Sequence, residues 1–299
     1  MDSIRTVFLG TGAAAPTRTR NVSSLAIVLD GRTLIFDAGE GTQHQLQRST
    51  VHTGSIEAIF ITHLHGDHLF GLPGLLATLG LNGRTAPLTL VGPPGLERYL
   101  RAIPYLGAPY EIRVAPAILP AAFEGFDVVA TEVDHSVDCY AYCLIEHDRR
   151  GTFDVARAEA LGIPPGPLFG KLQHGEDIEI DGRTIRSAEV LGPPRRGRRI
   201  AFVTDTRPCD AAIELARDAD LLIHEATYAN DHADDARERY HSTAEEAARV
   251  AKAANVKRLV LTHISARYDD TSALLQEARA IFPNTDVAED LLEIRLPNG

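Results

Sequence analysis

The stretch Ile59-Phe60-Ile61-Thr62-His63-Leu64-His65-Gly66-Asp67-His68 joins a short apolar run directly to a cluster of potential metal ligands. Imidazole nitrogens together with a carboxylate oxygen suit Zn²⁺, and Mn²⁺ or Fe²⁺ are further candidates by ligand type. A catalytic ion keeps one coordination position open for water, so this short loop holds more ligands than one such ion needs. The spacing therefore predicts two metal ions that share the loop. The four ligands are His63, His65, Asp67 and His68.

Three later segments also end a run of β-prone residues with a polar or ligating residue. They are residues 201–205, 221–225 and 259–263. Continuous apolar runs of this length are typical of strands that are covered on both faces, as in layered α/β folds. We therefore expect the ligating residues to cluster at strand ends, along one edge of a sheet.

Helices are expected between these strands. Apolar residues recur at helical spacing over residues 210–219, and a capping-box pattern at residues 242–246 opens a run that extends to Ala254. The N-terminal half offers mostly strands and turns, including residues 24–29 and 33–36. Strands in both halves with helices between them predict an α/β fold in which two sheets pack face to face with helices outside.

One region breaks this pattern. Residues 148–176 contain Ile163-Pro164-Pro165-Gly166-Pro167 and a second glycine-rich run at residues 170–175. The region is too rich in proline and glycine for a core and too long for a simple connection. We expect it to form a protruding arm between two strands.

Composition places the chain among soluble globular proteins. Its 299 residues are enough for one large α/β domain or two ordinary ones. The sequence has no run of 18 apolar residues, and the N-terminus has no signal-peptide pattern, so we expect a cytoplasmic protein without a membrane segment. The net charge of −11 argues against a surface that attracts nucleic acid everywhere, although arginines gather locally at residues 18–20 and 195–199.

Three isolated residues complete the predicted ligand set. His135, Asp205 and His263 each stand at a plausible strand exit. Two metal ions with three or four protein ligands each need about seven donors when one donor bridges the ions. The four ligands of the loop and these three residues supply that number.

The whole ligand pattern resembles the metallo-β-lactamase superfamily and, within it, the ribonuclease Z family, endonucleases that trim the 3′ trailer from precursor tRNA. The metal loop marks only the superfamily, whereas the proline- and glycine-rich arm and the later motifs mark the nuclease. The resemblance covers nearly the whole chain, with matching motifs at residues 8–12, 20–21, 36–43, 63–68, 71–75, 224–227, 241–243 and 262–268.

The resemblance implies a single four-layer αβ/βα sandwich domain over residues 1–299 that binds two zinc ions. One ion would be held by His63, His65 and His135, the other by Asp67, His68 and His263, with Asp205 bridging. Asp67 would also orient the attacking water or take up its proton. Cleavage would leave a 3′-hydroxyl on the tRNA and a 5′-phosphate on the trailer.

The leaving tRNA 3′-oxygen is a poor leaving group unless it is protonated, so a general acid is needed. We expect His241 to be that acid. It precedes a helix N-terminus, which lowers the pKa of a nearby imidazole, and the carboxylate of Glu225 is the candidate partner that raises it again. Asp37, at another strand end, is expected to support the metal loop through hydrogen bonds.

The resemblance also implies contacts with precursor tRNA. The arm, at residues 148–178 and including Lys171, matches the exosite with which the family grips tRNA far from the scissile bond. The loop at residues 16–21, which holds Arg18, Arg20 and Asn21, matches the family's loop beside the cleavage site, and Arg267 is expected to hold the 3′ end. The resemblance also implies a homodimer, in which one subunit's arm would serve the other's active site.

Parts of the sequence also fit other functions. Residues 10–15 fit a dinucleotide-binding fingerprint, but Pro16 stands where the phosphate-binding helix must run. A phosphodiesterase on small cyclic or aryl substrates, a thioester hydrolase or a lactonase would use the same metals, but thioester and β-lactam hydrolysis do not require the arm. An RNA-binding protein without catalysis has no need of an open dinuclear metal site.

Overall fold

The computed structural model describes residues 4–103 and 108–297. The chain divides into two compact units. The larger, here called the sandwich unit, comprises the described residues up to Ile145 and from Arg199 onward, and the smaller, here called the inserted unit, is Glu146–Arg198.

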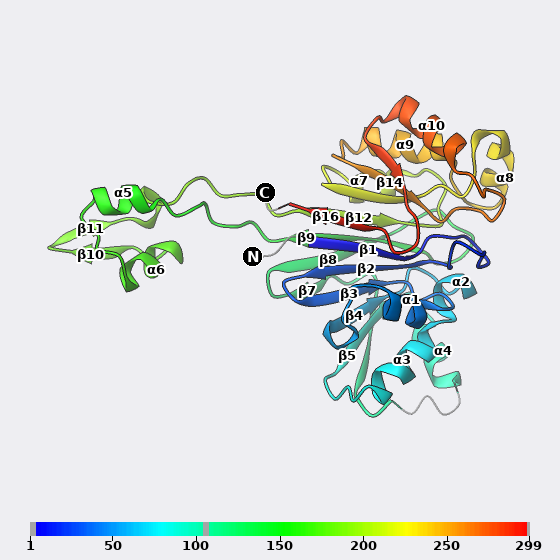
Figure 1. Cartoon of the computed structure of the whole chain (residues 1–299), viewed down its shortest axis with the longest axis horizontal. Helices are drawn as coiled ribbons and strands as arrows, with labels where there is room; N and C mark the ends of the chain where they lie inside the picture. Colours follow the sequence, from blue (N-terminus) through cyan, green and yellow to red (C-terminus); the bar gives the residue numbers. More distant parts are fainter. Residues whose placement is uncertain (1–3, 104–107, 298–299) are drawn as a thin grey trace. The chain divides into compact units, whose positions relative to one another are not determined.

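The sandwich unit contains two mixed β-sheets (Figure 1). In the first, the strands that follow β3 in the sheet run parallel to it. Its order is β16 (Glu293–Leu296), β1 (Ile4–Gly10), β2 (Ser24–Leu29), β3 (Arg32–Phe36), β4 (Ile56–Phe60), β5 (Leu88–Gly92) and β6 (Ile112–Pro116). The second runs in the order β15 (Thr285–Val287), β14 (Leu259–Thr262), β13 (Leu221–Glu225), β12 (Arg199–Val203), β9 (Tyr140–Glu146), β8 (Phe126–Glu132) and β7 (Ala121–Phe123).

Helices cover the outer face of each sheet (Figure 1). On the first sheet these are α1 (Thr42–Arg48), α3 (Leu72–Leu81) and α4 (Leu96–Ala102), while the short α2 (Gly66–Leu69) lies in the metal loop. On the second they are α7 (Asp210–Leu215), α9 (Ala244–Ala253) and α10 (Ser272–Ile281), and α8 (Ala233–Glu238) lies between α7 and α9 in the chain. Single 3₁₀ turns stand at Thr53–Ser55 and Asn230–His232.

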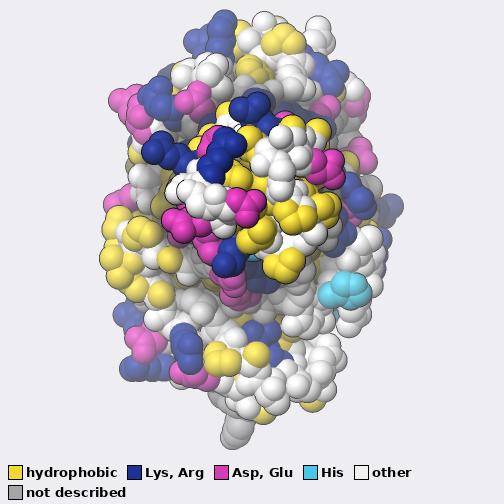
Figure 2. Space-filling view, turned by 90° about the vertical axis from the view of Figure 1, so that its left-hand side faces the viewer, with side chains coloured by type: hydrophobic (Ala, Val, Ile, Leu, Met, Phe, Trp, Pro, Cys, Tyr) yellow, Lys and Arg dark blue, Asp and Glu magenta, His cyan; other side chains and the backbone are white. Residues whose placement is uncertain are grey.

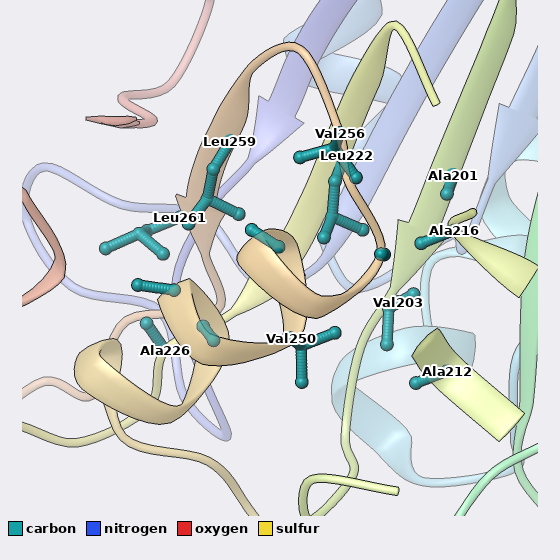
Figure 3. Close-up of a cluster of buried hydrophobic side chains, with 14 of the residues drawn as sticks. Ala201, Val203, Ala212, Ala216, Leu222, Ala226, Val250, Val256, Leu259 and Leu261 are labelled. Atoms are coloured by element: carbon teal, nitrogen blue, oxygen red, sulfur yellow. The ribbon is translucent and has the colours of Figure 1, made fainter. Parts of the chain in front are cut away.

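Buried residues show that the two sheets face each other. The central core combines Phe36 and Phe60 of the first sheet with Tyr142 and Phe202 of the second. The rings of Phe36 and Phe60 stack with centroids 5.0 Å apart. A separate core lies between the second sheet and its helices, where Leu222 and Leu261 face Val250 (Figure 3). The central strands of both sheets, such as β13 and β14, are buried on both faces, which explains their continuous apolar runs and confirms the predicted four-layer sandwich.

The predicted helices are confirmed with one difference in length. Helix α9 begins after Thr243, whose side chain and that of Glu246 form the expected capping box. Helix α7 ends at Leu215, although the pattern extended to residue 219. The chain turns there, because Asp218 has a left-handed backbone, with φ of 54°, which no helix continues.

The inserted unit has a small hydrophobic core of its own, which differs from our expectation that its composition excludes one. Its elements are α5 (Val155–Ala160), α6 (Pro167–Gln173), the hairpin β10 (Ile178–Ile180) and β11 (Arg183–Ile185), and a 3₁₀ turn at Ser187–Glu189. The core residues are Ala158, Ile163, Leu172, Ile178, Ile185 and Val190. A proline stands at the start of α6 and the glycines lie in turns. These residues therefore end or connect the elements and do not prevent a core from forming.

The two ends of the inserted unit run side by side. Antiparallel bridges join Arg149 to Arg195 and Phe153 to Leu191. Between them Gly151 and Gly192 approach so closely that a Cβ on Gly151 would lie 1.8 Å from the Gly192 carbonyl oxygen. The unit is thus closed by a two-stranded stem, and its bounds are wider than the predicted arm at residues 148–178.

The surface mixes charges of both signs. On the face seen in Figure 2, lysine and arginine side chains lie beside acidic and hydrophobic ones. Across residues 4–103 and 108–297, no helix combines the length and apolar character needed to cross a membrane.

Candidate metal centre and active site

The structure brings all seven predicted ligands together. They follow the carboxyl ends of strands: the metal loop follows β4, His135 follows β8, Asp205 follows β12 and His263 follows β14. In sandwiched α/β sheets this edge is where ligand-binding loops gather. The ligand atoms of His63, His65, His135 and Asp205 lie within 4.8 Å of one another, as do those of Asp67, His68 and His263.

The first group is a set of converging imidazole nitrogens. The Nδ1 atom of His65 lies 2.9 Å from Nε2 of His63 and 3.3 Å from Nε2 of His135. Burial lowers the pKa of His63 well below its usual value, which keeps that imidazole neutral at physiological pH. Imidazole nitrogens that share one small space are suited to a common cation.

Asp205 lies between the two groups. Its Oδ2 atom is 3.7 Å from His63 Nε2, whereas its Oδ1 atom is 3.3 Å from both His68 Nε2 and His263 Nε2. One carboxylate therefore presents one oxygen to each group. Burial favours the neutral form, but the three facing histidines outweigh it and hold the pKa of Asp205 well below its usual range.

Two nitrogens of the second group face carboxylate oxygens without forming a hydrogen bond to any described residue. They are His68 Nε2 and His263 Nε2, and both are buried. Orphaned buried polar atoms are unfavourable, and a coordinated cation would satisfy both. The donor set of imidazoles and carboxylates fits a divalent metal.

In three of the candidate ligand histidines, the ring nitrogen that faces away from the centre, Nδ1, contacts an oxygen atom. Nδ1 of His68 pairs with Asp37 Oδ2 at 2.7 Å, Nδ1 of His263 with Thr227 Oγ1 at 3.0 Å, and Nδ1 of His63 with Thr62 Oγ1 at 3.0 Å. These contacts aim Nε2 into the centre, as the outer partners of metal-bound histidines commonly do.

Asp37 is the most connected of these outer partners. Its Oδ1 atom accepts hydrogen bonds from the backbone N–H and the hydroxyl of Thr62, and its carbonyl oxygen accepts one from Ser24 Oγ. Its backbone is left-handed, with φ of 59°, a conformation that persists only where the surroundings hold it. Asp37 is buried and outside both ligand groups, in agreement with the supporting place expected for it.

Replacing Asp37 with alanine should lower the free energy of unfolding by about 3–5 kcal/mol, because His68 loses its buried partner. Metal affinity should fall about 10- to 100-fold. Urea unfolding and zinc titration measure the two effects. Ser23→Ala is the control, since it removes only the 3.4 Å contact to Asp37; equal effects of the two changes would contradict this role.

Asp67 is oriented by backbone as well as by histidines. Its Oδ2 atom accepts a hydrogen bond from the N–H of Ala14 at 2.8 Å and lies 3.4 Å from His68 Nε2 and 3.5 Å from His263 Nε2. Burial favours the neutral form, but the neighbouring His263 and His68 nitrogens outweigh it and lower the pKa of Asp67. The side chain therefore stays ionised beside the second group.

His241 and Glu225 form the expected pair. Nδ1 of His241 lies 2.9 Å from Oε1 of Glu225. Glu225 ends β13, is fully buried, and also accepts hydrogen bonds from the N–H of Thr206 at 2.8 Å and from Thr227 Oγ1 at 2.7 Å. Burial favours neutral groups, but their mutual attraction outweighs it: the pKa of His241 rises to about 9 and that of Glu225 falls. Cations bound nearby would lower the pKa of His241 again.

His241 faces the metal centre. It offers a ligand atom within 4.8 Å of those of Asp205 and His263, and its ring centroid lies 5.5 Å from that of His263. With Nδ1 on Glu225, the nitrogen left for chemistry is Nε2. That atom serves either as a proton donor or as a further ligand.

An open pocket of about 500 Å³ gives access to this centre. The ligands His65, Asp67 and His263 line it together with His241. Two further candidate ligands, His135 and Asp205, also line it, and the remaining wall is formed by residues 13–15, 238–240 and 265–266, with Ser136, Thr227 and Tyr228. A substrate can therefore reach the metal ligands and His241 from the same side.

The predicted RNA-contacting loop is held in place by Asp290. Arg18 is exposed, as a phosphate contact requires. Arg20 instead donates from Nη1 to Thr11 Oγ1 and to the Ala288 carbonyl oxygen, at 2.7 and 2.6 Å. Asn21 donates from its backbone to Asp290 and from Nδ2 to the carbonyl oxygen of residue 40. These internal partners favour structural roles for Arg20 and Asn21 over the substrate contacts we expected.

The other two predicted contacts lie outside the metal cluster. Arg267 is exposed at the surface, with its guanidinium carbon 5.2 Å from the ring centroid of Tyr228, which lines the pocket. Lys171 is an exposed residue of α6 in the inserted unit.

Sequence reasoning missed several residues that shape the site. Thr62 and Thr227 orient ligand histidines, and their places beside His63 and within the motif at residues 224–227 were the available signal. Asp290, which accepts hydrogen bonds from Thr11, Asn21 and Gln45, had no such signal.

Family models match two parts of the chain. Residues 4–102 match the family described as anti-Pycsar protein Apyc1, and residues 173–264 match the beta-lactamase superfamily domain. A metallo-beta-lactamase fold protein from Bacillus subtilis superposes with a TM-score of 0.72 at 19% identity, covering 99% of this chain and 100% of that one. This likeness supports the metallo-β-lactamase fold.

Relatives that align with nearly the whole chain identify the family within this superfamily. Ribonuclease Z from Microcystis aeruginosa is 50% identical over 98% of this chain and 96% of its own length, and ribonuclease Z from Methanosarcina acetivorans is 46% identical over 98% of both. The structure of human tRNase Z, short form, superposes with a TM-score of 0.70 at 31% identity, covering 98% of this chain and all of that one. The chain therefore belongs to the ribonuclease Z family, endoribonucleases of the metallo-β-lactamase fold.

Proposed function

We propose that this chain is a zinc-dependent endoribonuclease that removes the 3′ trailer of precursor tRNA in the cytoplasm. The products would be a tRNA with a 3′-hydroxyl and a trailer with a 5′-phosphate. The observation that carries the proposal is the pair of ligand groups on either side of Asp205, within a chain related along its whole length to ribonucleases Z.

Two zinc ions per chain fit the donor set, and Mn²⁺ or Fe²⁺ suit the same ligands. His63, His65 and His135 would hold one ion, and Asp67, His68 and His263 the other, with Asp205 shared between them. Bound divalent ions lower the pKa of water and neutralise negative charge on phosphoryl oxygens.

The chain's own residues would handle the protons. Asp67 borders the pocket, so its carboxylate can orient the attacking water or accept its proton. His241, charged through its pair with Glu225, would donate a proton from Nε2 to the departing 3′-oxygen. An acceptor and a donor on one pocket suit hydrolysis of a phosphodiester with a poor leaving group.

Purified protein and a precursor tRNA test this function directly. The 3′ end of the product tRNA should map to the trailer boundary. Cleavage should stop with a chelator and return with added zinc. Cleavage that persists at full rate after metal removal, or cutting at unrelated positions, would contradict the proposal.

We also propose that the inserted unit, including residues 148–178 and Lys171, is an exosite for tRNA, while Arg18 and Arg267 contact RNA near the cleavage site. A stem-closed unit with its own core suits this task, because it is built without any residue of the metal centre. The exposed cations Arg18, Lys171 and Arg267 suit phosphate contacts.

Replacing residues 152–191 with a two-residue turn should lower cleavage of precursor tRNA about 100-fold or more, while hydrolysis of a small phosphodiester stays within about twofold. The close approach of Gly151 and Gly192 allows such a short turn. We estimate the loss from several charge-assisted phosphate contacts of about 1.5–3 kcal/mol each. Equal loss on both substrates would contradict the exosite.

We further propose a homodimer in which the inserted unit of one subunit serves the active site of the other. Mixing the deletion variant with a full-length Asp205→Ala variant should then restore cleavage, since one supplies the metal centre and the other the exosite. Sedimentation verifies that mixed dimers form. Mixed dimers without restored cleavage would show that the unit serves its own subunit.

A further inference from the structure

We propose that Arg207 is a positioning residue that fixes the metal ligand His135 and the loop of His241 in a single arrangement. This inference concerns how the metal centre is held and rests on the proposed metal-dependent function. Arg207 stands two residues after Asp205, and its side chain spans two neighbouring loops of the sandwich unit.

The first contact is a two-point ion pair with Asp134, the residue before His135. Arg207 donates from Nε to Asp134 Oδ2 at 2.9 Å and from Nη2 to Oδ1 at 3.0 Å. The backbones are also joined, because the N–H of Arg207 donates to the Asp134 carbonyl oxygen at 3.0 Å. A planar fork on a carboxylate fixes direction as well as distance, which a lysine ammonium does not.

The second contact is with Tyr240, the residue before His241. The guanidinium carbon of Arg207 lies 4.2 Å from the centroid of the Tyr240 ring. Tyr240 has a left-handed backbone, with φ of 62°, which is rare for a bulky residue and needs surrounding contacts to persist. Its carbonyl oxygen lies 3.3 Å from Nδ1 of His135.

Arg207 therefore reaches His135 from two directions: through the backbone of Asp134 and through the carbonyl oxygen of Tyr240. That carbonyl aims Nε2 of His135 toward His65 Nδ1, 3.3 Å away. The ion pair is half-exposed, with the Arg207 and Asp134 side chains 33% and 42% accessible. Exposed ion pairs add little to stability, so its main effect is on orientation.

Zinc binding by Arg207→Ala tests the proposal. In competition with a chelating dye, the wild type should bind two equivalents of zinc. The variant should bind one of them about 10- to 100-fold more weakly and the other unchanged, because His135 belongs to one ligand group only. With a small phosphodiester, kcat should fall about tenfold or more and KM should stay within about twofold.

Arg258→Ala is the matched control. Arg258 pairs with Asp286 through Nε and Nη2 at 3.0 and 2.6 Å, and the two side chains are 36% and 38% accessible. This pair joins the residue before β14 to β15 and includes none of the candidate metal ligands, so zinc binding and kcat should not change. Arg207→Lys should be intermediate, and Arg207→Ala combined with Asp134→Ala should be no worse than either alone.

Wild-type zinc affinity and kcat in Arg207→Ala would overturn the proposal, and so would equal weakening of both zinc equivalents. If Arg207→Ala does not fold, Arg207→Lys and Asp134→Asn provide the same readout. Absence of precursor tRNA cleavage by the wild type, together with selective loss of one zinc equivalent in the variant, would refute the proposed function and leave this inference standing.

Discussion

Replacing Asp205 with alanine should abolish phosphodiester cleavage and leave less than two metal ions bound per chain. Its two oxygens face different ligand groups, at 3.7 Å from His63 Nε2 and at 3.3 Å from both His68 Nε2 and His263 Nε2. Without this carboxylate, both groups lose an anionic ligand at once. Metal ions contribute several kcal/mol to such reactions, so a loss of about a thousandfold or more in kcat is expected.

The Asp205→Ala result needs a control for backbone strain. Asp205 has a left-handed φ of 48°, and Asp30, in the exposed turn between β2 and β3, has the same φ. Asp30→Ala therefore carries the same conformational penalty without touching the metal centre. Metal analysis and kinetics on both variants separate the two causes. An Asp205→Ala protein that keeps two ions and its rate would eliminate Asp205 as the shared ligand.

Replacing His241 with alanine should lower the rate of RNA cleavage about 10²- to 10⁴-fold at full metal content, the range lost with a general acid. The loss should nearly vanish on a phosphodiester whose leaving group is already a weak base, because that group departs without a proton. This contrast distinguishes an acid from a ligand: a ligand would be needed for both substrates.

His232→Ala is the control for His241→Ala. His232 also pairs with a carboxylate, with Nδ1 2.9 Å from Asp235 Oδ2, but it lies outside the ligand groups. The His232→Ala variant should turn over RNA and the phosphodiester with the weakly basic leaving group at nearly the wild-type rate. Equal loss on both substrates in His241→Ala, accompanied by loss of metal, would identify His241 as a ligand instead.

The clustering of the candidate metal ligands was predictable because the sequence gives both the strand ends and the ligating residues that follow them. Apolar runs mark the strands, and parallel strands bring their carboxyl ends to one edge, so His135, Asp205 and His263 could be grouped with the metal loop before any coordinates were known. The pairing of His241 with Glu225 followed from the same reasoning, since Glu225 ends a strand.

Loop side chains were less predictable because their orientation depends on distant residues. Arg20 turns inward to Thr11, whose hydroxyl donates to Asp290, 279 positions later in the chain. No local pattern contains that information. The core of the inserted unit was missed for another reason: its apolar residues are separated by turns, so they follow neither a helical nor a strand period.

The hydrogen bonds from Thr11 to Asp290 connect the two ends of the chain, so the loop after β1 is held in place only after residue 290 has been synthesised. Asp290 anchors the same loop that directs the Ala14 N–H to Asp67. During synthesis, the ligands up to His263 emerge from the ribosome before this anchor does. A chain that ended short of position 290 would carry all seven candidate ligands without the carboxylate that anchors the loop orienting Asp67.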